Sequence, residues 1–328
     1  PSGFTEKVTD YLLEEYARLG YSAKRTVKGG VIAEIGGEGD PILTMAHVDT
    51  LGAVVAEIKS NGRLRLSPVG GFNANNAEAH NCRVYTYDGQ IYEGTIQLAD
   101  ASLHVNKEYS TTQRTFQSVE VVLDEPVTSK DDVKALGITN GCFVCADPNL
   151  VVTNSGYIKS RFLDDKLSAA ILLGYAKYIR ENNITPLRKV YQHMTVFEEV
   201  GHGACASIPE DVTELLSVDM GCVGDGLECT ERQVSICAKD GHGPYNYQVT
   251  TGLVNAAKKD SIDYAVDIYP FYGSDADAAL SAGKDARHGL IGAGVYASHG
   301  YERSHKDGVV NTFRLLCSYL NGNAPKMD

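Results

Sequence analysis

The stretch Val196-Phe-Glu-Glu-Val-Gly-His-Gly-Ala204 sets two adjacent carboxylates, Glu198 and Glu199, directly after an apolar run and before glycines. The preceding residues 189–197 have the β-branched and aromatic content of a buried strand, and the glycines end it. In an open α/β sheet, ligands bind where the strands end. Because adjacent carboxylates repel each other and residues 196–204 contain no lysine or arginine, the pair predicts a metal ion beside it. A solvated strand end is the simpler alternative for an isolated Glu-Glu pair.

Composition limits the classes of protein and partner. The 328 residues are 43% hydrophobic and 22% charged, which is typical of a soluble globular protein of one or two domains. A net charge of −12 argues against nucleic acid or an anionic membrane as partner. No apolar run is long enough for a membrane helix, and no signal-peptide pattern is present. The eight cysteines are mostly scattered singly, so we expect buried thiols and a cytoplasmic protein.

The periodicity of apolar residues changes twice along the chain. From Asp165 onward, helix and strand patterns alternate, which predicts an α/β fold with a mixed, largely parallel sheet flanked by helices. Residues 57–153 alternate with period two and carry a hairpin signal at Asp88-Gly89. We therefore expect a β-rich domain of residues 57–153 inserted into a domain of residues 1–56 and 154–328. A second copy of the chain would cover the exposed strand edges of the insert.

Five predicted strand or turn ends carry side chains of the kinds that bind metal ions. They are His47 with Asp49, Asp164 with Asp165, Glu198 with Glu199, Asp219, and His305. Each alone is weak evidence, since a histidine at a strand end is commonly a structural residue. Their joint order along an α/β pattern is stronger evidence for one site. Residues two apart on a strand point to the same face, so Asp49 is expected to orient the His47 ring.

At these residues the chain resembles the tetrahedral aminopeptidases, which include the glutamyl aminopeptidases and belong to the cocatalytic dinuclear metallopeptidases. The resemblance covers essentially the whole chain. The matching motifs are Ala46-His-Val-Asp-Thr-Leu-Gly52, Phe162-Leu-Asp-Asp-Lys166, Val196-Phe-Glu-Glu-Val-Gly-His-Gly-Ala204, Ser217-Val-Asp-Met220, Gly273-Ser-Asp-Ala276 and Arg303-Ser-His305. The resemblance implies a zinc-peptidase-like fold with an inserted dimerisation domain. It also implies that dimers assemble into a dodecamer that admits only short peptides.

The resemblance also implies two divalent metal ions and a role for each site residue. His47 and His305 would each bind one ion, and Asp164 would bridge both through a cis peptide to Asp165. Glu199 and Asp219 would complete one site each, while Glu198 and Asp49 would be the catalytic residues. His299 is the alternative to His305, since both lie in His299-Gly-Tyr-Glu-Arg-Ser-His305. Carboxylate and imidazole ligands suit zinc, cobalt and manganese, with zinc or cobalt expected first.

The expected activity is that of an aminopeptidase, which removes N-terminal residues from short peptides by attack of a metal-activated hydroxide, with Glu198 as general base. The cluster of Tyr301, Glu302 and Arg303, which lies next to His305 in the sequence, is expected to bear on substrate choice. A dinuclear amidase or deacylase that acts on N-acylated or peptide-like metabolites stays open. So does a carbohydrate hydrolase, because paired carboxylates also serve that chemistry. A non-catalytic scaffold is disfavoured, since no expected ligand or base is missing.

Overall fold

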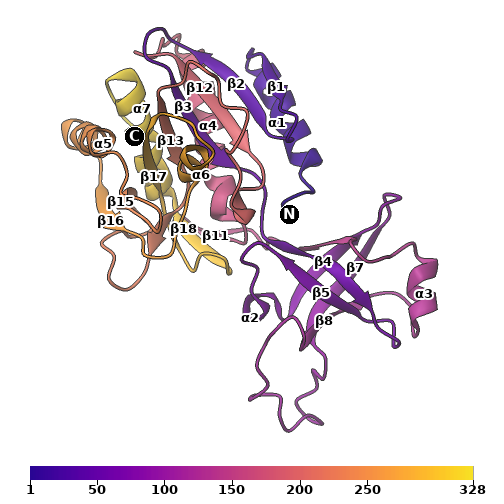
Figure 1. Ribbon diagram of the computed structural model, residues 1–328. Coiled ribbons are helices and arrows are strands. Elements are labelled where there is room, and N and C mark those ends of the chain that lie inside the picture. Colours follow the sequence, from indigo (N-terminus) through magenta and orange to yellow (C-terminus); the bar gives the residue numbers. More distant parts are fainter. Residues whose placement is uncertain (328) are drawn as a thin grey trace. The chain divides into compact units, whose positions relative to one another are not determined.

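Residues 1–327 are described by a computed structural model, and they form two compact units (Figure 1). The smaller unit contains Pro1–Phe4 and Thr50–Asn149, and the larger one contains Thr5–Asp49 and the chain from Leu150 onward. The boundaries expected at 56/57 and 153/154 therefore move to 49/50 and 149/150. The first four residues also leave the larger unit, because the ring of Phe4 packs against Phe143 at a centroid distance of 5.1 Å.

The larger unit is built on a mixed sheet whose central strands are parallel (Figure 1). The parallel strands are, in spatial order, β12 (Val190–Thr195), β3 (Ile42–His47), β13 (Glu214–Val218) and β17 (Arg287–Tyr296). The strands β2 (Val31–Gly36) and β1 (Ala23–Arg25) extend one side. On the other side lie β18 (Glu302–His305), β11 (Tyr157–Ser160), β10 (Val151–Val152), β14 (Gly221–Val223), β15 (Val234–Lys239) and β16 (Tyr264–Ile268).

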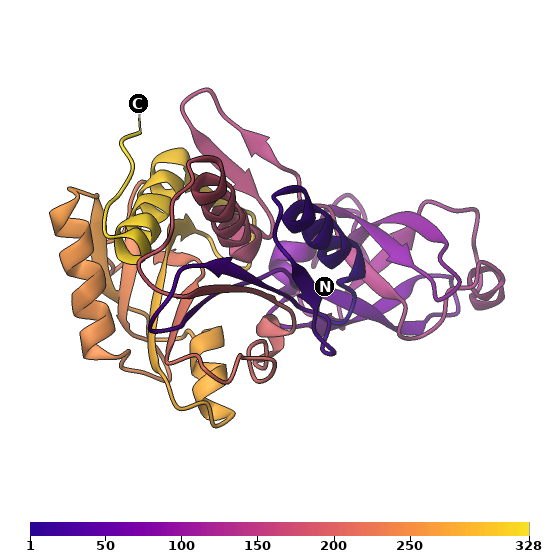
Figure 2. The ribbon, with the colours of Figure 1, turned by 90° about the horizontal axis from the view of Figure 1, so that it is seen from above.

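Helices cover both faces of this sheet. The helices α1 (Glu6–Arg18), α4 (Leu163–Glu181), α5 (Tyr247–Lys259) and α7 (Lys306–Asn321) contribute to one core, and α6 (Asp275–Ser281) packs on the opposite face. Both ribbon views show α4 and α7 side by side (Figures 1 and 2). Along β3, Ile42 and Ala46 join the first core while Leu43 and Met45 join the second. This alternation buries β3 on both faces, which confirms the predicted α/β fold.

The smaller unit is a closed six-stranded barrel. Its strands are, in order around the barrel, β4 (Gly52–Ile58), β5 (Leu64–Val69), β8 (Val119–Leu123), β7 (Ile91–Leu98), β6 (His80–Tyr85) and β9 (Phe143–Ala146). The short helices α2 (Ala74–Ala77) and α3 (Lys130–Ala135) lie between strands. Leu64 and Leu66 are buried while Arg65 between them is not, as period-two alternation requires. Closure pairs every barrel strand on both sides, so the expected exposed edges are absent from these six strands.

The parallel centre of the larger sheet determines where polar loops meet. His47 ends β3, the short 3₁₀ helix η1 (Glu198–Val200) follows β12, and Asp219 follows β13. Since these strands are neighbours, their carboxyl ends bring the three segments to one edge. Within residues 1–327, no helix is both long and apolar enough to span a membrane.

Candidate metal centre

The His47 ring lies among carboxylates at the end of β3. Its Nδ1 lies 3.0 Å from the backbone carbonyl oxygen of Asp49, and its Nε2 lies 2.9 Å from Asp164 Oδ1 and 3.7 Å from Glu198 Oε2. The residue is only 1% exposed. The nearer Asp49 atom is thus its carbonyl oxygen, whereas its carboxylate Oδ1 lies 3.5 Å from the ring. The structure therefore brings His47, Asp49, Asp164 and Glu198 together.

Asp164 presents its two carboxylate oxygens to two different histidines. Oδ1 faces His47, and Oδ2 lies 3.5 Å from Nε2 of His299. Burial opposes ionisation, but hydrogen bonds with His299 and His47 lower the pKa of Asp164 below its usual range. The peptide bond between Asp164 and Asp165 is cis, as the resemblance implied. One carboxylate at the start of α4 thus spans two imidazoles.

The glutamate pair is held by its backbone and directs its side chains to different partners. Phe197 has a left-handed φ of 68°, which turns the chain out of β12. The N–H groups of Glu198 and Glu199 then donate to the two carboxylate oxygens of Asp49, at 3.2 and 3.4 Å. Glu199 Oε2 lies 3.6 Å from Nε2 of His299. Burial raises the pKa of Glu199 to about 8 and that of Glu198 well above its ordinary value.

Asp219 closes the other side of the cluster. Its Oδ1 accepts a hydrogen bond from the N–H of Met220 at 2.6 Å, and burial together with the charge of Asp164 raises its pKa to about 7. Around His47, two sets of three side chains each place one ligand atom per residue within 4.8 Å of the others. They are His47, Asp164 and Glu199 in one set, and His47, Asp165 and Asp219 in the other.

His305, expected to be a metal ligand, lies outside this cluster in the structure. Its Nε2 donates to the carbonyl oxygen of Ser155 at 2.8 Å, and its Nδ1 accepts from the N–H of Asp307 at 3.1 Å. The second bond caps the start of α7. Both ring nitrogens are therefore used in local structure, and His299 stands beside the carboxylates instead. The hydrogen bond with Asp164 raises the pKa of His299 to about 9.

Two members of the cluster expected to bear on substrate choice, Glu302 and Arg303, make structural contacts away from the pocket. Glu302 is 2% exposed and accepts hydrogen bonds from the backbone of Asp164 and of His299. The guanidinium of Arg303 lies 3.7 Å from the centroid of the Tyr157 ring. Neither Glu302 nor Arg303 lines the pocket described below. Sequence reasoning missed the structural role of Glu302, because its contacts are to backbone groups that no motif shows.

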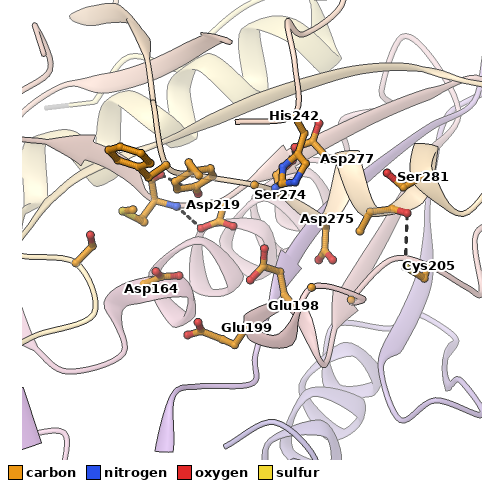
Figure 3. A pocket seen from close by; sticks show the side chains of 18 of the residues that line it. Asp164, Glu198, Glu199, Cys205, Asp219, His242, Ser274, Asp275, Asp277 and Ser281 are labelled. Atoms are coloured by element: carbon orange, nitrogen blue, oxygen red, sulfur yellow. Dashed lines mark hydrogen bonds between the residues drawn. The ribbon is translucent and has the colours of Figure 1, made fainter. Parts of the chain in front are cut away.

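An open pocket of about 650 Å³ lies over the carboxylates (Figure 3). Asp164, Glu198, Glu199 and Asp219 border one part of it, and Ser274, Asp275, Asp277 and His242 border another (Figure 3). None of the described lining residues is a lysine or an arginine. The pocket is thus acidic, which favours a cationic ligand group.

Asp275 holds the segment that carries the glutamate pair. It accepts a hydrogen bond from the hydroxyl of Thr195 at the end of β12, and another from the N–H of Ala204 at 2.7 Å. A Cβ atom at Gly203 would lie 2.0 Å from Asp275 Oδ1, so the close approach requires glycine there. Gly203 of the first motif and Asp275 of the Gly273-Ser-Asp-Ala276 motif therefore meet in one close contact.

The donor set fits divalent cations. Carboxylate and imidazole groups converge, and the buried oxygens Glu199 Oε1 and Asp165 Oδ1 have no hydrogen-bond partner among the described residues. Leaving such oxygens unpaired is costly, and a cation beside them would offset that cost. Burial and neighbouring carboxylates raise the pKa values of Glu199 and Asp219, and a bound cation would offset both effects.

The comparisons with known proteins agree with this fold. The YhfE protein of Bacillus subtilis (strain 168), named as an aminopeptidase, is 44% identical over 322 residues, which cover 98% of this chain and 93% of YhfE. A solved aminopeptidase of the TET type from Thaumarchaeota archaeon SCGC AB-539-E09 shares the fold with a TM-score of 0.88 at 19% identity, over 98% of this chain and 92% of the other.

A second solved structure is the TET1 peptidase of Pyrococcus horikoshii, which can assemble into a tetrahedron or a large octahedral shell. It has a TM-score of 0.84 at 24% identity and covers 96% of this chain and 93% of its own. These two structures show the fold, while the 44% identical relative and the family model indicate a peptidase hydrolase. The model of the M42 glutamyl aminopeptidases matches residues 29–315, and the chain belongs to this family.

Proposed function

We propose that this protein is a dinuclear metal-dependent aminopeptidase that removes N-terminal residues from short peptides. The observation that carries the proposal is the position of Asp164, whose two carboxylate oxygens face His47 and His299 separately. A carboxylate between two imidazoles can serve two cations at once. The family gives the aminopeptidase class.

The ligands divide into two sets that share Asp164. His47 and Asp219 would hold one ion, and His299 and Glu199 would hold the other. When bound, two divalent ions would supply Lewis acidity that polarises the peptide carbonyl and lowers the pKa of a bound water molecule. Zinc and cobalt suit these ligands, and manganese is a third candidate.

Glu198 is the proposed general base. It borders the pocket next to Glu199, and its Oε2 lies 3.7 Å from Nε2 of His47, so its carboxylate stands beside the proposed ligands. Glu198 would take a proton from the attacking water and pass it to the leaving amine. Asp49 would fix the direction of this base, because its carboxylate accepts hydrogen bonds from the backbone of both glutamates.

The charge of the pocket supports a substrate with a free amino terminus. Asp275 and Asp277 add carboxylates to the lining beyond the proposed ligands and base. A peptide ammonium group can pair with such an acidic wall, whereas an N-acylated substrate offers no cation. The amidase alternative is therefore less favoured.

Assembly is the second part of the proposal. We infer a cytoplasmic homo-oligomer that is built from dimers through the barrel unit, with a dodecamer as the expected species. Its support is the assembly of the P. horikoshii relative into closed shells. Because the barrel is closed and its six strands have no open edge, a dimer contact would have to use side chains on the outside of the barrel.

A substrate and metal panel tests the activity. Aminoacyl 4-nitroanilides and the matching N-acetylated compounds are assayed after chelation and after addition of zinc, cobalt or manganese. We expect hydrolysis of the free-amino compounds only, abolished by the chelator and restored by an ion. Comparable kcat/KM values for N-acylated amino acids would favour the amidase, and cleavage that resists the chelator would contradict metal dependence.

A further inference from the structure

Glu302 joins two segments that carry proposed metal ligands. Its Oε2 accepts a hydrogen bond from the N–H of Asp164 at 3.0 Å, and its Oε1 accepts one from the N–H of His299 at 3.0 Å. The side chain is buried. Each oxygen of the Glu302 carboxylate is therefore hydrogen-bonded to the backbone of a different proposed ligand.

The fold brings these segments together through adjacent strands. In the register of β11 and β18, Ser160 lies opposite Glu302, and the chain continues from Ser160 to Asp164. His299 lies in the turn just before β18, where it adopts a left-handed φ of 62°. A non-glycine residue in that conformation needs support from its surroundings, and the bond to Glu302 supplies it.

We propose that Glu302 is a positioning residue that sets the separation of Asp164 and His299 and thereby the affinity of the ion between them. This inference rests on the proposed dinuclear site. Glu302 does not touch the pocket and is not itself a ligand in this account. Partners that orient metal ligands are typically worth ~10–100-fold in metal affinity.

The effect should differ between the two ions. Asp164 contributes to both, but His299 contributes only to the ion that it shares with Glu199. No hydrogen bond or ion pair found among the described residues links Glu302 to His47 or Asp219. Loss of the Glu302 carboxylate should therefore weaken the His299 ion more than the His47 ion.

The experiment is a calorimetric titration of zinc into three metal-free proteins: wild type, Glu302→Gln and Glu231→Gln. Glutamine keeps the shape of the side chain but places an amide NH₂ against one of the two backbone N–H groups. Glu231 is the matched control. It accepts a hydrogen bond at 3.2 Å from Nε of Arg303, the residue after Glu302, but no hydrogen bond among the described residues joins it to the backbone of a proposed ligand. We expect two ions in the wild type and in Glu231→Gln. In Glu302→Gln we expect one ion with near-normal affinity and one ion weakened ~10–100-fold.

The outcomes separate the two proposals. A wild type that binds fewer than two ions overturns the dinuclear site itself. Two unchanged affinities in Glu302→Gln, or an equal loss at both sites, overturn the positioning role. If Glu302→Gln does not fold, the positioning role is tested by amide hydrogen exchange of the metal-free wild type. Exchange is followed in the peptides that contain Asp164 and His299. Protected amides are expected at both residues, and exchange at unprotected rates at either one overturns the inference.

Discussion

His299 Nε2 lies 3.5 Å from Asp164 Oδ2, whereas His305 donates to the carbonyl oxygen of Ser155. We therefore expect His299→Ala to lose one of two metal ions and His305→Ala to keep both. His305→Ala should instead lower the free energy of unfolding by ~0.5–2 kcal/mol, the usual cost of losing a helix N-cap. Metal analysis and denaturant unfolding of the two variants check this. Loss of an ion in His305→Ala alone would reverse the assignment.

The glutamate pair should separate catalysis from metal binding. Glu198→Gln is expected to keep its metal content and to lose a factor of ~10²–10⁴ in kcat, the usual range for a positioned acid or base. Glu199→Gln is expected to lose one ion, because its carboxylate lies beside His299. Kinetics measured together with metal analysis distinguishes the two. An ion missing from Glu198→Gln would mean that the roles are exchanged.

The metal-free protein should lose stability as the pH rises. The pKa of Glu199 is about 8 when folded, well above the ~4.3 of an unfolded glutamate. The folded state therefore keeps a proton that the unfolded state has released. The stabilisation is full below pH ~4 and is lost as the pH rises toward 8.

Thermal unfolding in chelator between pH 5 and 8.5 measures this effect. Glu199→Gln cannot titrate at that position, so its melting temperature should fall less steeply than that of the wild type. Added zinc should stabilise the wild type most at the upper end of the range, since it binds the deprotonated ligands. Parallel curves for the two chelated proteins would exclude Glu199 as the source.

The oligomeric state tests the assembly proposal. Size exclusion with light scattering is expected to show particles well above the 35.4 kDa chain at micromolar concentration, with a dodecamer as the expected species. Replacement of residues 50–149 by a short Gly-Ser linker should give smaller particles. A monomeric wild type would contradict the assembly while leaving the metal chemistry standing.

The sequence predicted the strand ends correctly because short motifs and strand order fix them. His47 ends one buried strand, while Glu198 and Asp219 come after the ends of two others, and the carboxyl ends of parallel neighbours meet at one edge. The choice between His299 and His305 could not be made from the sequence for a physical reason. Which of the two faces Asp164 depends on the turn before β18, and spacing along the chain does not determine how that turn folds.

Long-range backbone contacts also lay beyond the sequence. The sequence placed Glu302 in a cluster expected to bear on substrate choice, whereas its buried carboxylate accepts hydrogen bonds from the backbone of Asp164 and His299. The alternation in the insert indicated strands, but closure of the barrel depends on pairing of β4 with β9, which are far apart in the chain. The unit boundary at Thr50 likewise depends on packing of the barrel and not on composition.

The central claim is that Asp164 bridges two metal ions, and calorimetric zinc titration of three metal-free proteins tests it most directly. The wild type should bind two ions per chain, Asp219→Ala should weaken mainly one, and Asp164→Ala should lose tight binding of both. Two normal affinities in Asp164→Ala would contradict the account.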